Sequence, residues 1–532
     1  MFYQLVSRFR RLRKRPLPPA VVRNHVSTWP SISYMTPATK DGKEFTFLGL
    51  TELFGGDWSR SGCSKLWLYN LHYQDDLNAK GARANDELCH QMIDAWILGN
   101  PFPKGAGWEP YCISLRVVNW VKYFYRLERS QLNSEWLESL SSQTDALEQQ
   151  LEFHLLANHL FANAKALVFV GTFLGGKQGD RWLHLGLKLL EKEILEQFLN
   201  DGAHYELSPM YQAILLWDLA DLQCLAKVTG LPELERHVGL WEAKFSKGMG
   251  WLYRMTHPDG QIAFFNDAAF NIGPTFHDLQ KYADQLGISI PIGDSGTVLP
   301  IAGCFMKESG YASVEWAAHG RLIIDVAFIG ASYQPGHAHA DTLSCEFSLF
   351  GQRIFVNSGI SQYGEDAERT RQRSTAAHNT LEVDGQNSSE VWAGFRVARR
   401  AQPFDVEFSA QVEDVAISAS HDGYHRLVGK VTHRRLWVAK ENSLIIEDSL
   451  TGVWAEAKVY WHFHPDITIE RLDDERFLLQ LKGGSNIMLH IMGGEAKLLD
   501  GTWHPRFGES VVNKKLVINI YGSKMRTSLH WR

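Results

Sequence analysis

The sequence predicts a helical region followed by a region of antiparallel β-strands. Up to about residue 290, apolar side chains recur at spacings of three and four, which is typical of amphipathic helices. Beyond about residue 310, apolar and polar residues alternate with a period of two, which is typical of half-buried strands. The stretch between these patterns is rich in Gly, Pro and Ser, as expected of a linker. A multidomain chain, α then β, is therefore expected.

The first region contains six segments with helical spacing, separated by turns that contain Gly or Pro. Short connections between consecutive helices predict antiparallel pairs. Ser208 is expected to cap one helix and Pro209 to be its first residue, which places Tyr211 in the first turn. The predicted helices are 84–98, 112–129, 143–173, 180–200, 208–229 and 233–256.

The second region contains short strands separated by turn signals such as Asp384-Gly385. Many short strands at regular spacing favour a large antiparallel β-sandwich. The predicted strands are 321–328, 343–349, 380–383, 412–419, 434–439 and 458–463. The expected organisation is an N-terminal basic arm and lead-in at 1–60, a helical domain at 61–290, a linker at 291–310 and a β-sandwich domain at 311–532.

Composition excludes several classes of protein. The 532 residues are 45% hydrophobic and 21% charged, which excludes a disordered chain, and a net charge of −6 argues against nucleic acid as a partner. The six Cys show no short paired spacing, so neither a zinc ribbon nor a disulfide scaffold is expected. The absence of a long apolar run predicts no transmembrane segment. The N-terminal basic and apolar residues do not follow the order of a secretory signal, so a cytoplasmic location is expected, with a periplasmic or non-classically secreted protein as the alternative.

The chain is rich in aromatic residues, with 18 Trp, 17 Tyr and 28 Phe. Such a content indicates either a large core or a cleft in which flat sugar rings stack. Trp96, Trp217 and Trp251 follow apolar helix stripes and are expected in the core. Trp108 and Trp120 lie beside polar residues and are expected to line a cleft.

Polar clusters of the β region mark possible chemistry. His337 and His339, followed by Asp341, are two residues apart and share one face of an extended segment, which suits metal binding or acid–base catalysis. The alternative is a pair of exposed loop histidines. His378 could complete a metal site with His339. The arginines at 369, 371 and 373 could meet an anionic substrate or form a solvated loop.

Polar residues also interrupt the helical region. Asn158 and His159 lie in an apolar helix, where buried polar side chains need partners, so they either satisfy one another or line a cleft. Tyr205, Glu206 and Tyr211 could face a cavity. A further helix carries a cation, an amide and aromatic rings three or four residues apart, which suits a sugar-acid site or an ordinary core-facing stripe. These residues are Arg116, Asn119, Trp120 and Tyr123.

Taken together, the motifs resemble the heparinase II/III-like polysaccharide lyases. The resemblance runs in family order from about residue 60 to 470, and implies an incomplete (α/α) toroid followed by a layered β-sandwich. It also implies cleavage of a uronic-acid glycan by β-elimination. The matching motifs are Trp67-Leu-Tyr-Asn-Leu-His-Tyr73, Trp108-Glu-Pro-Tyr111, Asn158-His159, Glu206-Leu-Ser-Pro-Met-Tyr211, Phe265-Asn-Asp267, Gly336-His-Ala-His-Ala-Asp341, Asn357-Ser-Gly359, His378-Asn379 and His462-Phe-His-Pro465.

β-Elimination explains the residue types that the resemblance assigns. A base removes the C5 proton of a uronate, an acid protonates the leaving oxygen on C4, and a third group neutralises the carboxylate. By the resemblance Tyr211 and His337 are base and acid, in an order that depends on the unknown C5 epimer. A Tyr base requires a lowered pKa, which neighbouring cations would supply. Asn158, with His159 or Arg116, suits the carboxylate.

Further contacts and a metal complete the expected site. The resemblance implies a metal, commonly zinc, bound by His339, residue 357 and His378. Asn357 stands where the family usually has Asp, and its uncharged oxygen lowers the expected affinity, with Asp341 as the alternative ligand. The residues expected to bind substrate are Trp108, Arg116, Asn119, Trp120, Tyr205, Glu206 and Arg371.

The predicted function is a polysaccharide lyase whose partner is an acidic polysaccharide or oligosaccharide of envelope or capsule metabolism. Two alternatives stay open. One is a glycan-binding protein without turnover, consistent with Asn357. The other is a glycoside hydrolase that uses paired carboxylates, for which Glu206 and Asp267 are candidates.

Overall fold

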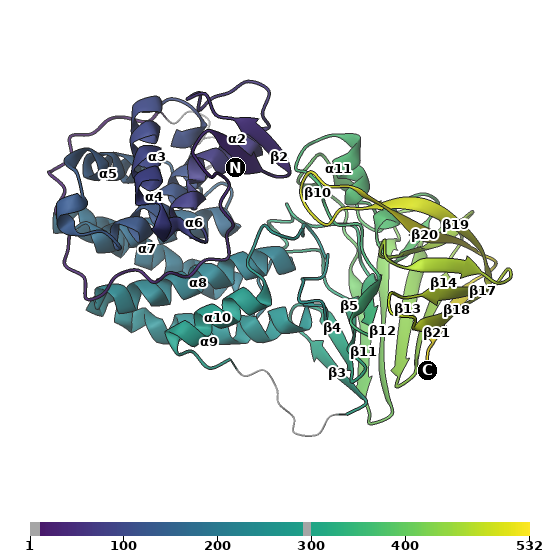
Figure 1. Cartoon of the computed structure of the whole chain (residues 1–532). Helices are drawn as coiled ribbons and strands as arrows, with labels where there is room; N and C mark the ends of the chain where they lie inside the picture. The colour runs from purple at the N-terminus through teal and green to yellow at the C-terminus, as the bar shows by residue number, and fades with distance from the viewer. Residues whose placement is uncertain (1–10, 291–298) are drawn as a thin grey trace. The chain divides into compact units, whose positions relative to one another are not determined.

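A computed structural model describes residues 11–290 and 299–532 of the chain, in a helical part followed by antiparallel sheets (Figure 1). Residues 1–10 of the basic arm and residues 291–298 of the expected linker lie outside the described residues, and residues 301–306 of that expected linker form a strand. The chain forms two compact units. The helical unit comprises Met1–Phe198, Ile214–Ser246 and His277–Ser289, and the β unit comprises Leu199–Ala213, Lys247–Phe276 and Ile290–Arg532. Tyr211 and Asp267 therefore belong to the same unit as His337.

The helices confirm the predicted pattern, and α2 and α10 are two further short helices of this region. A small hairpin, β1 (Glu44–Phe47) and β2 (Leu50–Leu53), precedes them. The division between the units falls within α8, α9 and α10. The helices are α2 (Lys65–Tyr73), α3 (Asp86–Gly99), α4 (Pro110–Phe124), α5 (Ser134–Glu148), α6 (Ala157–Phe173), α7 (Gly176–Gln197), α8 (Pro209–Thr229), α9 (Pro232–Arg254) and α10 (Phe276–Leu286).

The prediction of one helix over 143–173 is wrong, because α5 ends at Glu148 and α6 begins at Ala157. Leu156 (φ 60°) and Ala157 (φ 52°) have positive φ values, which a continuous right-handed helix cannot contain. Asn163 of α6 holds the intervening turn, accepting a hydrogen bond from the Glu152 backbone N–H (2.9 Å) and donating to its carboxylate (3.0 Å). The leucines on both sides of the break keep the spacing of a helix, so periodicity alone missed it.

The β unit contains three large antiparallel sheets. One is the five-stranded β3 (Ile301–Met306), β4 (Tyr311–Trp316), β5 (Gly320–Asp325), β6 (Cys345–Leu349) and β7 (Gln352–Phe355). The second has the order β11 (Pro403–Ala410), β12 (Asp414–Tyr424), β13 (Val431–Lys440), β14 (Ser443–Thr451), β21 (Lys524–His530), β18 (Asn486–Met492), β17 (Arg476–Gln480) and β16 (Thr468–Arg471). The third has the order β19 (Gly494–Trp503), β20 (Val511–Ile520), β15 (Ala457–His462) and β8 (Leu381–Val383).

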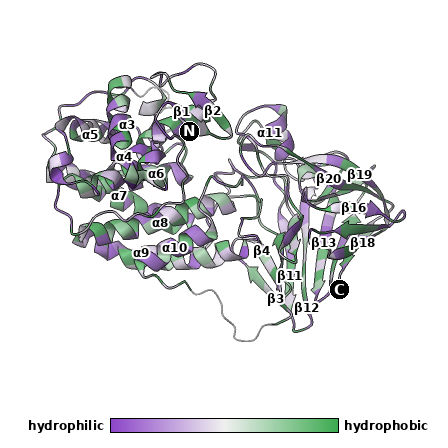
Figure 2. Ribbon diagram, in the orientation of Figure 1, coloured by the Kyte–Doolittle hydropathy of each residue, from purple (hydrophilic) through white to green (hydrophobic). Residues whose placement is uncertain are grey.

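One apolar core joins these sheets, as a sandwich requires. It includes Val314 of the first sheet, Trp437 of the second and Val459 of the third. Along β13 every second residue is buried, and in Figure 2 the colour changes repeatedly along such strands. This alternation is what the period of two predicted.

The five-stranded sheet is covered on both faces. Its other face forms a second apolar cluster, in which Tyr311 and Ile323 pack with Trp251 at the end of α9 and with Phe265. The loop that follows β5 and the segment around Phe265 are thereby held against one fixed scaffold. These are the two segments that carry His337 and Asp267.

Two further sequence predictions can be compared with the fold. Trp96, Trp217 and Trp251 are buried at 1%, 7% and 1% exposure, which confirms their place in the core. Across residues 11–290 and 299–532, none of the helices combines the length and apolar character needed to cross a bilayer.

Candidate active site

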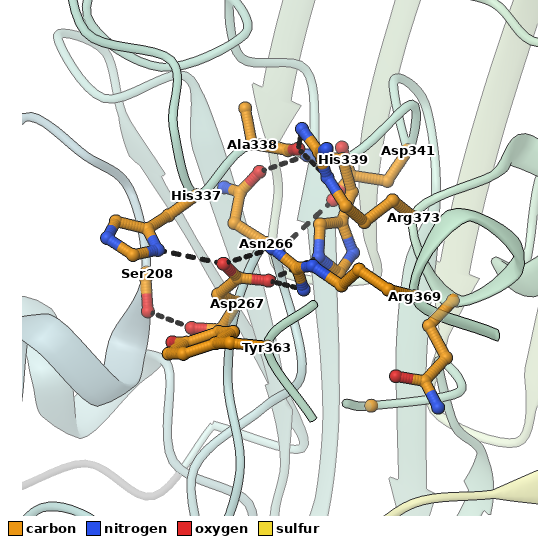
Figure 3. Close-up of polar contacts among 12 residues, drawn as sticks. Ser208, Asn266, Asp267, His337, Ala338, His339, Asp341, Tyr363, Arg369 and Arg373 are labelled. Atoms are coloured by element: carbon orange, nitrogen blue, oxygen red, sulfur yellow. Dashed lines mark hydrogen bonds and ion pairs between the residues drawn. The ribbon is translucent and has the colours of Figure 1, made fainter. Parts of the chain in front are cut away.

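The site of the β unit is organised around the buried carboxylate of Asp267 (Figure 3). His337 and His339, on the loop between β5 and β6, both hydrogen-bond to it, at 2.8 Å from His337 Nδ1 and 2.9 Å from His339 Nε2. Arg369 of α11 (Ala367–Gln372) donates two hydrogen bonds to it, with Nη2 at 2.7 Å from Oδ2. Burial by itself raises the pKa of Asp267, but the Arg369 guanidinium and the imidazole hydrogen bonds outweigh burial and hold that pKa well below its usual range.

Asn266 fixes the backbone on which Asp267 sits. It adopts a left-handed conformation (φ 57°), which Asn tolerates better than most residues. Its side-chain amide donates to the Leu207 carbonyl (2.9 Å), and its side-chain oxygen accepts from the His339 backbone N–H (3.1 Å). One side chain thus ties the segment before α8 and the histidine loop to the Asp267 segment.

Tyr211 reaches the same site from the first turn of α8, as predicted. Ser208 caps this helix, since its hydroxyl oxygen accepts from the Tyr211 backbone N–H (3.3 Å) while donating to the Asp267 carbonyl (2.6 Å). The Tyr211 ring lies 4.3 Å from the His337 ring between centroids, and its hydroxyl is 3.0 Å from that of Tyr363. The two residues to which the resemblance assigned the proton transfers are therefore adjacent.

The lowered pKa that Tyr211 would need to act as a base is absent from this arrangement. Burial of the ring, with Tyr363 and the carboxylate of Glu206 next in effect, raises that pKa well above its ordinary value of 10.0. The nearby cation, Arg369, is engaged by Asp267 and does not offset these effects. Tyr211 is consequently a phenol that keeps its proton.

His337 is flanked by two carboxylates. Its Nδ1 binds Asp267, while its Nε2 lies 3.6 Å from Glu206 Oε2. An ionised carboxylate only accepts hydrogen bonds, so Asp267 fixes the tautomer of a neutral His337 with the proton on Nδ1. The lone pair of Nε2 is then available to take a proton.

Two of the three expected metal ligands are oriented to bind a cation. His339 donates through Nε2 to Asp267, and His378 donates through Nδ1 to the Ser374 carbonyl (2.7 Å). The remaining nitrogens, His339 Nδ1 and His378 Nε2, face one another at 3.0 Å. Burial lowers both pKa values, that of His339 to about 3, so two lone pairs converge as they do at a metal site with ordered outer partners.

The third expected ligand, Asn357, is less suited. Its amide donates to the Phe264 carbonyl (2.9 Å), and its oxygen accepts from the Asn379 backbone N–H (3.1 Å). No group of three His, Cys, Asp or Glu side chains in the described chain, Asp341 included, forms a metal site. The imidazole pair fits a metal, but the neutral, engaged amide fits it poorly, so a bound zinc stays a prediction.

The three arginines before His378 have different roles. Arg369 binds Asp267, and Arg373 is buried and donates to the Ala338 carbonyl through Nε (3.1 Å) and Nη2 (2.9 Å). Of the three arginines, Arg371 alone has an exposed side chain, at about 40%, and it forms an ion pair with Glu368. Arg369 and Arg373 are therefore structural, whereas substrate binding by Arg371 stays a prediction.

The residues of α4 and the preceding turn that were expected to bind substrate are buried in the helical unit, so their contact with substrate stays a prediction. Arg116 is 0% exposed, stacks 3.7 Å from the Trp96 ring, and donates to the His72 and Gly107 carbonyls and to Gln143. The other three are also buried and hydrogen-bonded within this unit: Trp108 to the Asn100 carbonyl, Asn119 to Asp75 and the Tyr73 carbonyl, and Trp120 to Gln74. Their polar atoms hydrogen-bond within the core, which favours the core-facing stripe over the sugar-acid site as the explanation of their spacing.

Asn158 and His159 lie at the start of α6 in the helical unit. The Asn158 side chain hydrogen-bonds to the Tyr111 hydroxyl, and His159 Nδ1 lies 3.1 Å from Glu152 Oε1. The His159 ring also packs against Tyr111, at 4.5 Å between centroids. The expected role of this pair toward a substrate carboxylate stays a prediction, as does substrate contact by Tyr205 and Glu206 of the β unit.

Comparison with known families agrees with this geometry. The heparinase II/III-like C-terminal profile matches residues 302–532, and the heparinase II/III N-terminus profile matches residues 78–284. The chain belongs to the heparinase II/III-like family. The motifs that carry Tyr211, Asp267 and His337 lie within these matches.

Curated relatives of this heparinase II/III-like chain include two heparin-sulfate lyases. That of Bacteroides thetaiotaomicron is 22% identical over 343 residues, which cover 56% of this chain and 48% of the relative. That of Pedobacter heparinus is 22% identical over 452 residues, 78% of this chain and 64% of the relative. The match thus spans about half the length of the first relative and somewhat less than two thirds of the second.

Solved structures confirm the fold predicted for the family. The crystal structure of heparinase III has a TM-score of 0.72 at 17% identity, covering 93% of this chain and 80% of that one. The heparan sulfate lyase HepC mutant of Pedobacter heparinus has a TM-score of 0.65 at 16% identity, covering 92% and 81%. At such identity the likeness concerns the helical toroid and β domains alone.

Sequence reasoning missed the residues that hold the site together. Asp267 was included in a family motif but given a role only as a hydrolase carboxylate, Arg369 was considered only as part of a basic run, and Tyr363 was not considered. The Asn266-Asp267 pair was a usable signal, because it is a polar dipeptide after an apolar run. No local pattern relates Tyr363 or Arg369 to Asp267, about 100 residues away in sequence.

Proposed function

We propose that this chain is a polysaccharide lyase, a carbon–oxygen lyase that cleaves a uronic-acid-containing glycosaminoglycan by β-elimination. The observation that carries the proposal is the adjacency of Tyr211 and His337, whose ring centroids are 4.3 Å apart. The imidazole of His337 is oriented by its hydrogen bond to the Asp267 carboxylate. The heparin-sulfate lyases among its relatives support the choice of glycan class.

His337 is the better base of the pair. Its Nδ1 proton is held by Asp267, so Nε2 can accept the C5 proton of the uronate. The resulting imidazolium lies between two carboxylates, Asp267 at 2.8 Å and Glu206 at 3.6 Å, which stabilise the positive charge as it forms. Both carboxylates are in place before the reaction.

Tyr211 is the better acid. Burial keeps its phenol protonated, and its hydroxyl is positioned by Tyr363 at 3.0 Å. The phenol can donate its proton to the C4 oxygen as the bond to the leaving sugar breaks. Asn158 remains the sequence-based candidate for neutralising the uronate carboxylate. A metal ion held by His339 and His378, when bound, would supply a fixed positive charge that cross-links their two segments, and the proton transfers are assigned to Tyr211 and His337 alone.

The hydrolase alternative is disfavoured by the state of Asp267. A hydrolase acid must hold a proton near neutral pH, whereas the pKa of Asp267 is held well below its usual range. Its two oxygens are also engaged by Arg369 and the two imidazoles. Asp267 therefore orients His337.

Ultraviolet absorbance tests the proposal, because β-elimination leaves a conjugated double bond and hydrolysis does not. The full chain is expected to release absorbing products from heparan sulfate or another uronate polymer. Tyr211→Phe and His337→Ala should each lower kcat by at least about 10²-fold. Full activity in both variants would refute the roles. Binding without product across heparan sulfate, hyaluronan, chondroitin and alginate would favour a glycan-binding protein.

A further inference from the structure

A short hairpin borders the Tyr211–His337 site and exposes two aromatic rings. It consists of β9 (Val391–Trp392) and β10 (Arg396–Val397), paired antiparallel. Trp392 is 55% exposed and Phe395 is 42% exposed. A single exposed ring is common on protein surfaces, but two exposed rings on one short hairpin form a small apolar surface, and sugar-binding sites use such rings to stack on pyranose faces.

The hairpin is continuous with the site through Phe395. The Phe395 ring centroid lies 5.9 Å from that of His337 and 5.4 Å from that of Tyr363. A ligand that covered the exposed part of Phe395 would therefore be adjacent to the proposed base. This places the hairpin at the position of a neighbouring sugar, next to the one that reacts.

The hairpin is firmly anchored to the same buried arginines that organise the site. Arg369 donates to the Gly394 carbonyl (3.1 Å), and Arg373 donates to the Ala393 (2.9 Å) and Arg396 (3.2 Å) carbonyls. Arg369 also binds Asp267. The aromatic rings are thus held on a fixed backbone rather than on a loose loop, and binding a ligand requires little ordering of the chain.

Arg396 adds a positive charge beside Trp392. The two residues are directly opposite one another across the strand pair, so their side chains project from the same face of the hairpin. Arg396 is exposed, and no ion pair links it to a carboxylate in the described parts of the chain. A guanidinium next to an indole face suits a sugar that carries a carboxylate or a sulfate.

We propose that the β9–β10 hairpin is a subsite for an anionic pyranose ring of the glycan chain, with Trp392 and Phe395 stacking on the sugar and Arg396 pairing with its acidic group. The glycan class rests on the proposed function, but the subsite itself is judged by binding and not by turnover. Its ligand is a sugar next to the cleaved one.

Calorimetry with a heparan sulfate hexasaccharide tests the subsite in the full-length Tyr211→Phe chain, in which cleavage is suppressed. Trp392→Ala is expected to weaken binding roughly three- to tenfold, the value of one aromatic stacking contact, whereas Trp392→Phe keeps a flat ring and most of the affinity. Arg396→Gln is expected to weaken binding at low salt, with the difference fading as salt screens the charge.

Two variants separate the subsite from general effects. Phe395→Leu keeps an apolar contact for His337 and Tyr363 but loses the flat face, so it should weaken binding and leave thermal stability unchanged. Phe404→Ala removes a comparably exposed ring on β11 (37% exposed) and should not change the Kd. The subsite is overturned by an unchanged Kd in both Trp392→Ala and Arg396→Gln, by an equal loss in Phe404→Ala, or by no hexasaccharide binding to the parent chain.

The binding results distinguish this inference from the proposed lyase activity. If the unmodified chain yields no absorbing product while Trp392→Ala still weakens hexasaccharide binding, the lyase activity fails and the subsite stands. If products form with the same KM in the Trp392→Ala and Arg396→Gln chains, the lyase activity stands and the subsite fails.

Discussion

Removing the charge of Asp267 is expected to impair stability and catalysis by separable amounts. Asp267 and Arg369 are both 0% exposed and form a two-fold ion pair. In Asp267→Asn the guanidinium of Arg369 stays buried without a counter-charge, which costs roughly 3–5 kcal/mol. With a urea m value of roughly 2–3 kcal/mol/M, the unfolding midpoint of the β unit should fall by about 1–2.5 M.

The double variant Asp267→Asn/Arg369→Met distinguishes stability from function. Both buried charges are then absent, and replacing a whole buried ion pair with neutral groups is often nearly neutral in free energy. We expect the double variant to regain at least half of the lost free energy of unfolding. Its kcat should stay low, because His337 has lost the carboxylate that fixed its tautomer, an effect of roughly 10³–10⁴-fold.

The assays are urea denaturation followed by tryptophan fluorescence, and ultraviolet detection of unsaturated products. Arg399→Met is the matched control, since Arg399 makes a similar two-fold pair with Glu390 at the surface and its loss should leave the midpoint unchanged. The reasoning fails if Asp267→Asn retains kcat within about tenfold, or if the double variant is as unstable as the sum of its single variants.

Two other predictions concern the expectations about metal and substrate. Asn357→Asp should tighten zinc binding about tenfold or more in a direct titration, because residue 357 is the third ligand that the family resemblance implies beside His339 and His378, and a carboxylate there adds negative charge. An unchanged zinc Kd would contradict residue 357 as a ligand. Arg116→Met should lower the free energy of unfolding of the helical unit by about 3 kcal/mol or more, because the guanidinium donates hydrogen bonds to buried protein groups. The KM of the folded protein should stay unchanged. A raised KM at unchanged stability would instead support a role of Arg116 in substrate binding.

The sequence predicted those structural features that depend on neighbouring residues and missed those that depend on residues distant in the chain. The N-cap Ser208 and the first-turn position of Tyr211 follow from neighbouring residues, and both were correct. The break between α5 and α6 was missed, because it depends on the positive φ of Leu156 and on Asn163, a residue in the next helix. Leucines at helical spacing occur on both sides of the break, so their spacing does not indicate where the helix ends.

The polar stripe of α4 shows why spacing could not assign a role. Arg116, Asn119 and Trp120 do share roughly one face, but that face is covered by His72, Gln74 and other residues of the helical unit. A buried arginine with backbone acceptors and a substrate-binding arginine have the same local sequence. Only the surrounding atoms distinguish them.

The sequence by itself determined the order of the two regions, the family and the pair Tyr211 and His337, since each depends on periodicity or on short motifs. The tertiary structure alone decided the protonation of Tyr211, the orientation of His337 and the role of Asp267. Each of these depends on burial and on charges contributed by segments about 50 to 150 residues apart, such as Arg369 and Tyr363. Electrostatic effects act through space, and the distances that set them exist only in the folded chain.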